Sequence, residues 1–148
     1  MNRPAIAAVL FLAATAVPIQ AQELKAEDQV KQRKSGYAVI GHNFGSLGAM
    51  AQGKKPYNKE EAVRNAELVS MLADYPKHFF GPGTDKGETK AKPEIWKNRS
   101  DFDDKMEAMI VEARKLPQAA RGDLASLKKA VGDTGAKCKA CHDDYRAK

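Results

Sequence analysis

The chain has 148 residues and a formal net charge of +6, with 25 lysines and arginines against 19 acids. Charges of both signs are interspersed, so the basic excess argues only weakly for nucleic acid or a membrane surface, and we expect neither as a partner. The sequence contains two cysteines, which excludes a disulfide-rich scaffold and leaves the fold to packing and to any bound cofactor.

The N-terminus has the pattern of a secretory signal peptide. It starts with the short basic segment Met1-Asn2-Arg3, continues with an apolar, uncharged run over residues 5–17, and offers Ala21 for cleavage. This run is shorter than the roughly 20 residues of a membrane-spanning helix, with an uncleaved anchor as the alternative. We expect a signal peptide at residues 1–21 and one exported domain at residues 22–148.

Apolar residues recur near the helical period between Glu27 and Gln52, which predicts a first helix. These residues are Val30, Tyr37, Ile40, Phe44, Leu47 and Met50. The segment also contains four glycines, each about 1 kcal/mol less favourable than alanine in a helix interior: Gly36, Gly41, Gly45 and Gly48. We expect a flat group or another backbone to approach the helix at these glycines, with simple weakening of the helix as the alternative.

A second helix is predicted from a cap at Asn58, with Glu61 closing a capping box, to about Asp74. Its core positions are Ala62, Ala66, Val69 and Leu72. The glycine-rich residues 77–91 are predicted to form one long loop, and loops of that length are usually functional or disordered. Residues 93–96 are predicted to form a single helical turn that holds the one tryptophan.

Two more helices follow. Ser100 is predicted to cap the third, and Pro117 to end or kink it. Its apolar face comprises Phe102, Met106, Met109, Ile110 and Ala113. The fourth is predicted to begin at Gly122-Asp123, with a core face of Leu124, Leu127, Val131, Cys138, Cys141 and Tyr145. Four amphipathic helices without strand-like alternation predict an all-α fold, an antiparallel up-down four-helix bundle with a cofactor between its helices.

The fourth helix carries Cys138-Lys139-Ala140-Cys141-His142, the attachment motif of a c-type haem. Positions i and i+3 share a helix face, so both thiols can reach the vinyl groups of one macrocycle, and His142 is placed to ligate its iron. The alternatives are a redox pair, half of a zinc site and a small-loop disulfide. A thioredoxin-type pair needs a βαβ setting, and a zinc site needs two more ligands, whereas His42 and His78 are far off in sequence.

Three segments resemble the cytochrome c′ family, the class II c-type cytochromes. They are residues 135–146 around the attachment motif, Phe80-Gly81-Pro82-Gly83-Thr84 followed by Pro93-Glu94-Ile95-Trp96, and residues 27–33. The resemblance covers essentially all of residues 22–148. It implies a periplasmic protein with one haem c, covalently bound through Cys138 and Cys141, and with His142 on the iron.

The resemblance also implies roles for charged and polar residues. Arg146 resembles the basic residue beside the proximal histidine, and Arg33 resembles the arginine near the haem propionates, with Lys34 next to it. Glu88 and Thr89 fall where the loop approaches the haem edge in the family. For each charged residue, a solvated surface ion is the alternative.

Tyr37 takes the position that faces the distal side of the iron in the family. Five-coordinate members have leucine, phenylalanine or tyrosine there, whereas low-spin relatives of the c556 type have a methionine ligand. Met50 lies about 20 Å further along the helix, at 1.5 Å per residue, and is too distant to substitute. A buried core tyrosine is the alternative reading of Tyr37.

The resemblance therefore implies a five-coordinate, high-spin haem that binds nitric oxide and carbon monoxide and is able to transfer electrons. A low-spin electron carrier of the c556 type is the alternative function. We see no paired acid and base beside the haem motif and do not expect an enzyme. The family commonly forms homodimers through its first two helices, and the redox partner protein is not indicated by any residue.

Overall fold

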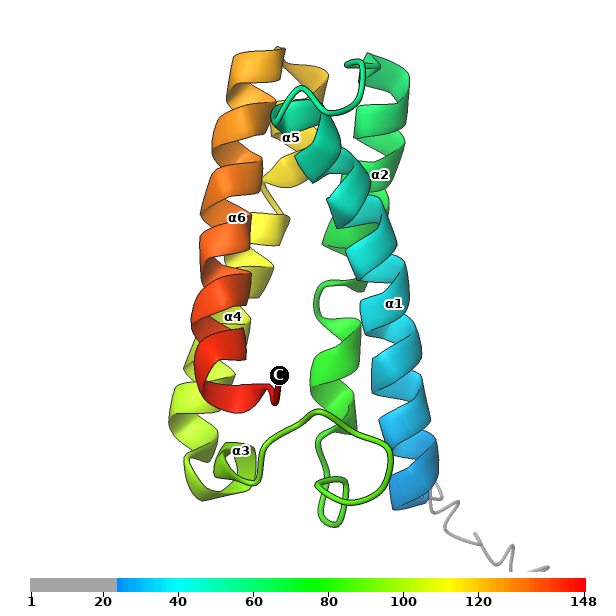
Figure 1. The fold of residues 1–148 in the computed structure, drawn as a ribbon, viewed down its shortest axis with the longest axis vertical. Coiled ribbons are helices and arrows are strands. Elements are labelled where there is room, and N and C mark those ends of the chain that lie inside the picture. Colours follow the sequence, from blue (N-terminus) through cyan, green and yellow to red (C-terminus); the bar gives the residue numbers. More distant parts are fainter. Residues whose placement is uncertain (1–23) are drawn as a thin grey trace, which may run out of the picture.

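The computed structural model describes residues 24–148, which form an antiparallel bundle of four long helices (Figure 1). The long helices are α1 (Ala26–Ala51), α2 (Lys59–Leu72), α4 (Arg99–Ala113) and α6 (Leu124–Tyr145). Three short helical segments connect them: the 3-10 helix η1 (Tyr75–Phe79), α3 (Glu94–Lys97) and α5 (Leu116–Arg121). Successive long helices run in opposite directions, and the predicted all-α bundle is confirmed.

Helix caps agree with the sequence at two of the predicted starts. The Asn58 side chain accepts a hydrogen bond of 2.8 Å from the Glu61 N–H, and Asp123 accepts one of 2.7 Å from the Ser126 N–H. The Glu61 carboxylate, however, accepts hydrogen bonds from Lys55 at 2.5 Å and from Ser46 at 2.9 Å. It therefore ties α2 to the C-terminal part of α1, which is a different role from the predicted capping box.

The third long helix starts and ends differently from the prediction. Ser100 is not its cap, because α4 already begins at Arg99. The capping position is taken by Asn98, which also follows the last residue of α3 and makes no side-chain capping bond. The helix ends at Ala113, ahead of Pro117, which lies in the first turn of α5. A proline is tolerated there because the first N–H groups of a helix have no intrahelical partner.

Gly36 is the one position where the expected close approach to α1 is confirmed. A Cβ atom built on it would lie 2.9 Å from the Tyr75 ring and 3.2 Å from the Pro76 ring, so η1 packs directly on α1. The predicted loop at residues 77–91 is accordingly shorter, since η1 takes its first part. At Gly45 and Gly48 the expectation is wrong, because an added Cβ would meet no atom within 4 Å.

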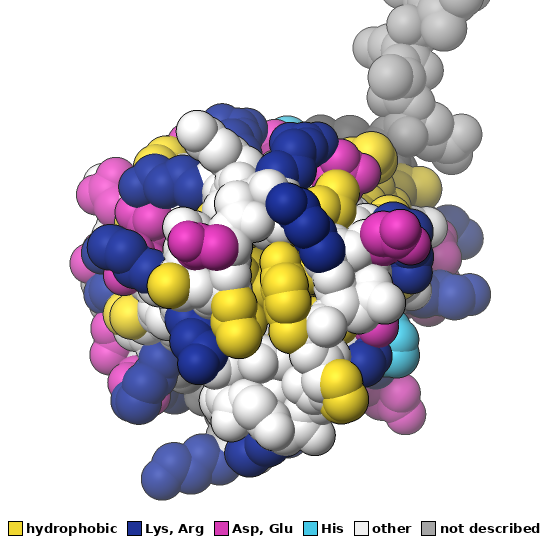
Figure 2. All heavy atoms as spheres, turned by 90° about the horizontal axis from the view of Figure 1, so that it is seen from above, with side chains coloured by type: hydrophobic (Ala, Val, Ile, Leu, Met, Phe, Trp, Pro, Cys, Tyr) yellow, Lys and Arg dark blue, Asp and Glu magenta, His cyan; other side chains and the backbone are white. Residues whose placement is uncertain are grey.

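The core lies along the bundle axis and is formed by the apolar faces predicted from the helical period. All five apolar positions predicted on the third helix are buried, as are Leu47 and Met50 on α1. Tyr37, Ile40 and Phe44 are only half-buried, and these three line a cavity. At the end of the bundle formed by α5 and the start of α6, hydrophobic side chains gather near the centre within a ring of charged ones (Figure 2).

None of the helices in residues 24–148 has both the length and the apolar composition that crossing a membrane requires. The predicted signal peptide lies outside the described residues.

Candidate cofactor site

A cavity of about 850 Å³ opens between α1, α4, α6 and the loop that joins η1 to α3. Its lining includes all nine residues for which the sequence predicted a site role: Arg33, Lys34, Tyr37, Glu88, Thr89, Cys138, Cys141, His142 and Arg146. These nine residues come from three segments that are distant in sequence: α1, the loop, and α6 with the residue that follows it. The rest of the lining is mostly apolar, with Ile40, Phe44, Val69, Phe80, Ile95, Phe102, Met106 and Met109.

The two cysteines lie on the α6 wall of this cavity. Cys141 is buried, Cys138 is half-buried, and they are not joined by a disulfide. Burial raises the pKa of the Cys141 thiol to about 11 and also raises the pKa of Cys138. Reactive redox cysteines have lowered pKa values, so the environment disfavours the redox-pair alternative. Within residues 24–148, no three His, Cys, Asp or Glu side chains gather to hold a metal ion.

His142 follows Cys141 and lines the same cavity. Desolvation lowers the pKa of its imidazole, and the positive charge of Arg146 lowers it further, with Asp143 opposing both. These effects favour the neutral imidazole, which is the form that binds a metal through nitrogen. The local electrostatics therefore suit an axial ligand.

Arg146 lies beyond the end of α6. Its N–H bonds to the His142 carbonyl at 3.1 Å, but its φ and ψ of −119° and 127° are extended. The backbone around it forms an antiparallel bridge with Ala91, in which the Ala147 N–H donates to the Lys90 carbonyl at 2.8 Å. The position of the Arg146 side chain thus depends on this bridge and not only on helical spacing from His142.

Arg33 on α1 is almost completely buried, with 2% of its surface exposed. Its guanidinium donates to the Phe79 carbonyl at 3.0 Å, the Thr84 carbonyl at 2.5 Å and the Thr89 hydroxyl at 2.6 Å, and it lies 4.6 Å from the centre of the Phe80 ring. It forms no ion pair within residues 24–148. Burial lowers its pKa, with Tyr37 and Asp85 opposing. Because a buried cation without an anion is costly, this end of the cavity suits a carboxylate.

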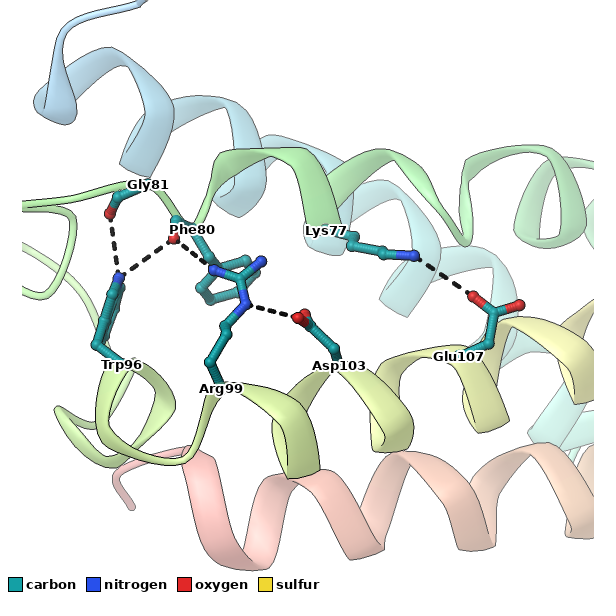
Figure 3. Close-up of polar contacts among 7 residues, drawn as sticks. All are labelled: Lys77, Phe80, Gly81, Trp96, Arg99, Asp103 and Glu107. Carbon is teal, nitrogen blue, oxygen red and sulfur yellow. Dashed lines mark hydrogen bonds and ion pairs between the residues drawn. The ribbon is translucent and has the colours of Figure 1, made fainter.

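The loop after η1 is also held from the α3 and α4 side (Figure 3). Trp96 Nε1 donates to the Phe80 and Gly81 carbonyls at 3.2 and 3.1 Å, and Arg99 donates to the Phe80 carbonyl at 3.0 Å. The carboxylate of Asp103 accepts from Arg99 Nε at 2.8 Å, and Lys77 pairs with Glu107 at 3.4 Å. The segments 80–84 and 93–96, singled out in the sequence, therefore bond to each other and fix the loop at the cavity.

Four lysine or arginine side chains and one acid line the cavity, and all of them except the buried Arg33 are exposed at its mouth. The cations are Arg33, Lys34, Lys90 and Arg146, and the acid is Glu88. Lys34 and Glu88 form an exposed ion pair of 3.7 Å between α1 and the loop, and such pairs contribute about 0–1 kcal/mol. The excess of positive charge at the mouth suits the carboxylates of a bound group.

Tyr37 lies on the α1 wall, and its hydroxyl donates to the Met106 sulfur at 3.4 Å. Burial raises its pKa well above the usual range, with smaller contributions from Cys141 and Cys138 and an opposing one from Arg33. Sequence reasoning assigned Met106 to the core only, because it continues the apolar stripe of α4. Its spacing gave no signal that distinguishes a cavity-lining sulfur from a packed one.

A haem fits the chemistry of this donor set. It needs two thiols on one helix face, an imidazole for the iron, apolar walls for a flat macrocycle and cations for two propionates. The α6 wall, the aromatic and aliphatic lining, and the mouth offer these groups. Cys138 and Cys141 would hold the macrocycle and His142 the iron.

Residues 28–146 match the family described as Cytochrome C′. A cytochrome c′ from Rubrivivax gelatinosus is 42% identical over 126 residues, which cover 84% of this chain and 98% of that protein. A cytochrome c-554 from Cereibacter sphaeroides is 36% identical and covers 99% of both chains. The nitric oxide complex of a cytochrome c′ variant from Alcaligenes xylosoxidans superposes with a TM-score of 0.78 at 41% identity, covering 86% of this chain and 99% of that one.

Proposed function

Because the chain belongs to the cytochrome c′ family, we propose that it is an exported cytochrome c′ with a five-coordinate, high-spin haem that binds nitric oxide and carbon monoxide and transfers electrons. The family binds one covalent haem c. When bound, the haem would supply an iron that binds diatomic gases and exchanges single electrons. We propose no catalysed reaction.

The observation that supports this proposal is the position of Tyr37 on the α1 wall. Tyr37 brings a phenol to the cavity, and the hydroxyl of that phenol already donates a hydrogen bond to the Met106 sulfur. A neutral, hydrogen-bonded phenol with a raised pKa is a poor iron ligand, because tyrosine ligates as the phenolate. Tyr37 would therefore cover the free axial position without occupying it and would require a gas molecule to displace its ring.

The remaining site residues would bind and orient the haem. Cys138 and Cys141 would form its thioethers, and His142 would be the protein ligand. Arg33, Lys34 and Thr89 would face the propionates, and Glu88 would limit access through its pair with Lys34. Arg146 would place a positive charge beside His142, as its lowering of the histidine pKa indicates.

One observation favours a second function, that of a low-spin electron carrier. Met106 places a thioether sulfur in the cavity, and methionine with histidine is the ligand pair of electron-transfer cytochromes c. The similarity to a cytochrome c-554 is compatible with this alternative. In that case Met106, rather than a methionine on α1, would be the sixth ligand.

Absorption spectra of the ferric and ferrous protein distinguish the two functions. A high-spin spectrum in both oxidation states, which changes on addition of carbon monoxide or nitric oxide, supports the gas-binding site. A fully low-spin spectrum that does not respond to carbon monoxide would contradict the gas-binding function and support the low-spin electron carrier. Mass spectrometry of protein recovered from the periplasm tests export, with a mature chain beginning at Gln22 as the expected result.

We also propose a homodimer through α1 and α2. Val39, Leu68, Met71 and Tyr75 are exposed along α1, α2 and η1, with Met71 74% exposed. Residues 38–51 of α1 contain no lysine, arginine, aspartate or glutamate, so a second copy could cover the α1 part of this face without burying charge. Sedimentation of Met71→Glu should show monomer, whereas Val111→Glu on α4 should remain dimeric; a wild-type monomer contradicts the proposal.

A further inference from the structure

We propose that Met106 is a positioning residue for gas binding: its sulfur accepts the hydrogen bond that holds the Tyr37 ring on the α1 wall, and this bond breaks before a gas enters. The inference rests on the proposed open axial site. It assigns a function to a residue that the sequence places only in the core.

The contact joins two helices that do not pack side by side. The helix α1 packs beside α2 and α6, and α4 packs beside the same two helices, so α1 and α4 occupy diagonal corners of the bundle (Figure 1). The Tyr37 hydroxyl nevertheless lies 3.4 Å from the Met106 sulfur. The Tyr37 side chain therefore reaches across the bundle, and its far end is fixed by α4.

The sulfur is the only hydrogen-bond partner of the Tyr37 hydroxyl within residues 24–148. Thioether sulfur is a weak acceptor, but Met106 is only 2% exposed, so its sulfur has little access to water as a competing partner. A partly buried hydroxyl that loses its partner loses the free energy of that hydrogen bond. Moving the Tyr37 ring away from Met106 thus has a free-energy cost that adds to the cost of disturbing the packing.

Two substitutions remove the contact from opposite sides. Tyr37→Phe deletes the donor and keeps the ring, and Met106→Leu deletes the acceptor and nearly conserves the volume. We expect each to speed carbon monoxide association with the ferrous protein roughly three- to tenfold, the range for loss of one hydrogen bond. The double variant should be no faster than the faster single variant, because both substitutions remove the same contact.

A second measurement reports on the phenol independently of gas binding. The ultraviolet resonance Raman bands of tyrosine should shift in Met106→Leu, and no such shift should occur when the substitution is made in a Tyr37→Phe background. Met109→Leu removes a sulfur from the same helix to which the Tyr37 hydroxyl does not bond, so it should leave the tyrosine bands unchanged. Thermal unfolding of the wild type, Tyr37→Phe, Met106→Leu and the double variant should show the same non-additivity as the carbon monoxide association rates.

The outcomes separate this inference from the proposed function. If wild-type protein binds carbon monoxide but Met106→Leu matches it in association rate and in tyrosine bands, Met106 does not position Tyr37 and the inference is wrong. Strictly additive rates in the double variant overturn it as well. If the wild type is low-spin and Met106→Leu converts it to high-spin, Met106 is an iron ligand, and the inference fails together with the open site.

Discussion

The guanidinium of Arg33 on α1 donates a hydrogen bond of 2.6 Å to the hydroxyl of Thr89, 56 positions further along the chain. The same hydroxyl oxygen accepts a bond of 3.0 Å from the Ala91 N–H. Both acceptor positions of the Thr89 oxygen are therefore used, and its own proton remains available to donate. The Thr89 hydroxyl thus joins the loop at the cavity mouth to α1, in addition to the Arg33 bond to the Thr84 carbonyl and the Lys34–Glu88 pair.

Removing this hydroxyl should loosen the loop. Thr89→Val keeps the shape but leaves a buried N–H of Arg33 without its acceptor, and we expect a loss of about 1–3 kcal/mol in the free energy of unfolding. Thr89→Ser retains the oxygen and should lose less. Denaturant unfolding of the two variants measures the difference, and equal stabilities would show that the bond contributes nothing.

Covalent attachment depends on the two thiols of α6. The double variant Cys138→Ala, Cys141→Ala should lose covalent haem and unfold more easily, because a ligand bound only to the folded state stabilises that state. Acid–acetone extraction followed by haem assay is the measurement. Haem that stays with the polypeptide after extraction of this variant would show that the attachment site lies elsewhere.

Arg146→Ala should change the reduction potential while leaving haem content unchanged. The substitution removes a positive charge that acts on His142, and it keeps the backbone bridge to Ala91. The potential should fall, since a positive charge near the iron favours the reduced state. Lys148→Ala, at the C-terminus, is the matched control, and a potential equal in both variants and wild type would make Arg146 a surface ion.

Tyr37→Met should shift the ferric spectrum towards low spin and slow carbon monoxide binding, because a thioether on the α1 wall could occupy the free axial position. Tyr37→Ala should have the opposite effect on the rate, since no ring has to move out of a packed site. Absorption spectra and stopped-flow mixing measure both. Identical rates in the two variants would indicate that residue 37 does not face the gas site.

Asp101 should make the fold sensitive to acid. Its carboxylate accepts hydrogen bonds of 2.5 Å from Lys105 and from the Tyr145 hydroxyl, and these lower its pKa below the ordinary value of 3.8. A lowered pKa in the folded state stabilises the fold above pH 3.8, and this contribution is lost as the pH falls through the folded-state value.

Thermal unfolding between about pH 6 and about pH 3 tests this dependence. The unfolding temperature of Asp101→Asn should fall less with acidification than that of the wild type. Asp104→Asn, an exposed acid on the same helix outside this network, should follow the wild-type curve. A wild-type-like slope in Asp101→Asn would show that the contacts to Lys105 and Tyr145 contribute little to stability.

The local features of this protein were predictable from its sequence. Helical spacing places Cys138 and Cys141 on one face, and the apolar period marks the buried positions of α4, because both depend on residues within one or two turns. Asn58 and Asp123 were recognisable as caps for the same reason. Ser100 was not a cap because α3 ends immediately before α4, which no local propensity indicates.

The tertiary structure alone decided which distant residues bond to one another at the cavity. The partners of Arg33 lie 46 to 56 positions away, and Met106 lies 69 positions from Tyr37. The bridge between Ala91 and Arg146 likewise joins the loop to the end of α6. These contacts depend on the rotation and spacing of packed helices, which many apolar patterns satisfy equally well. The haem-attachment motif can therefore be read from neighbouring residues in the sequence, whereas the contacts of Tyr37 and Arg33 at the cavity depend on how the helices pack.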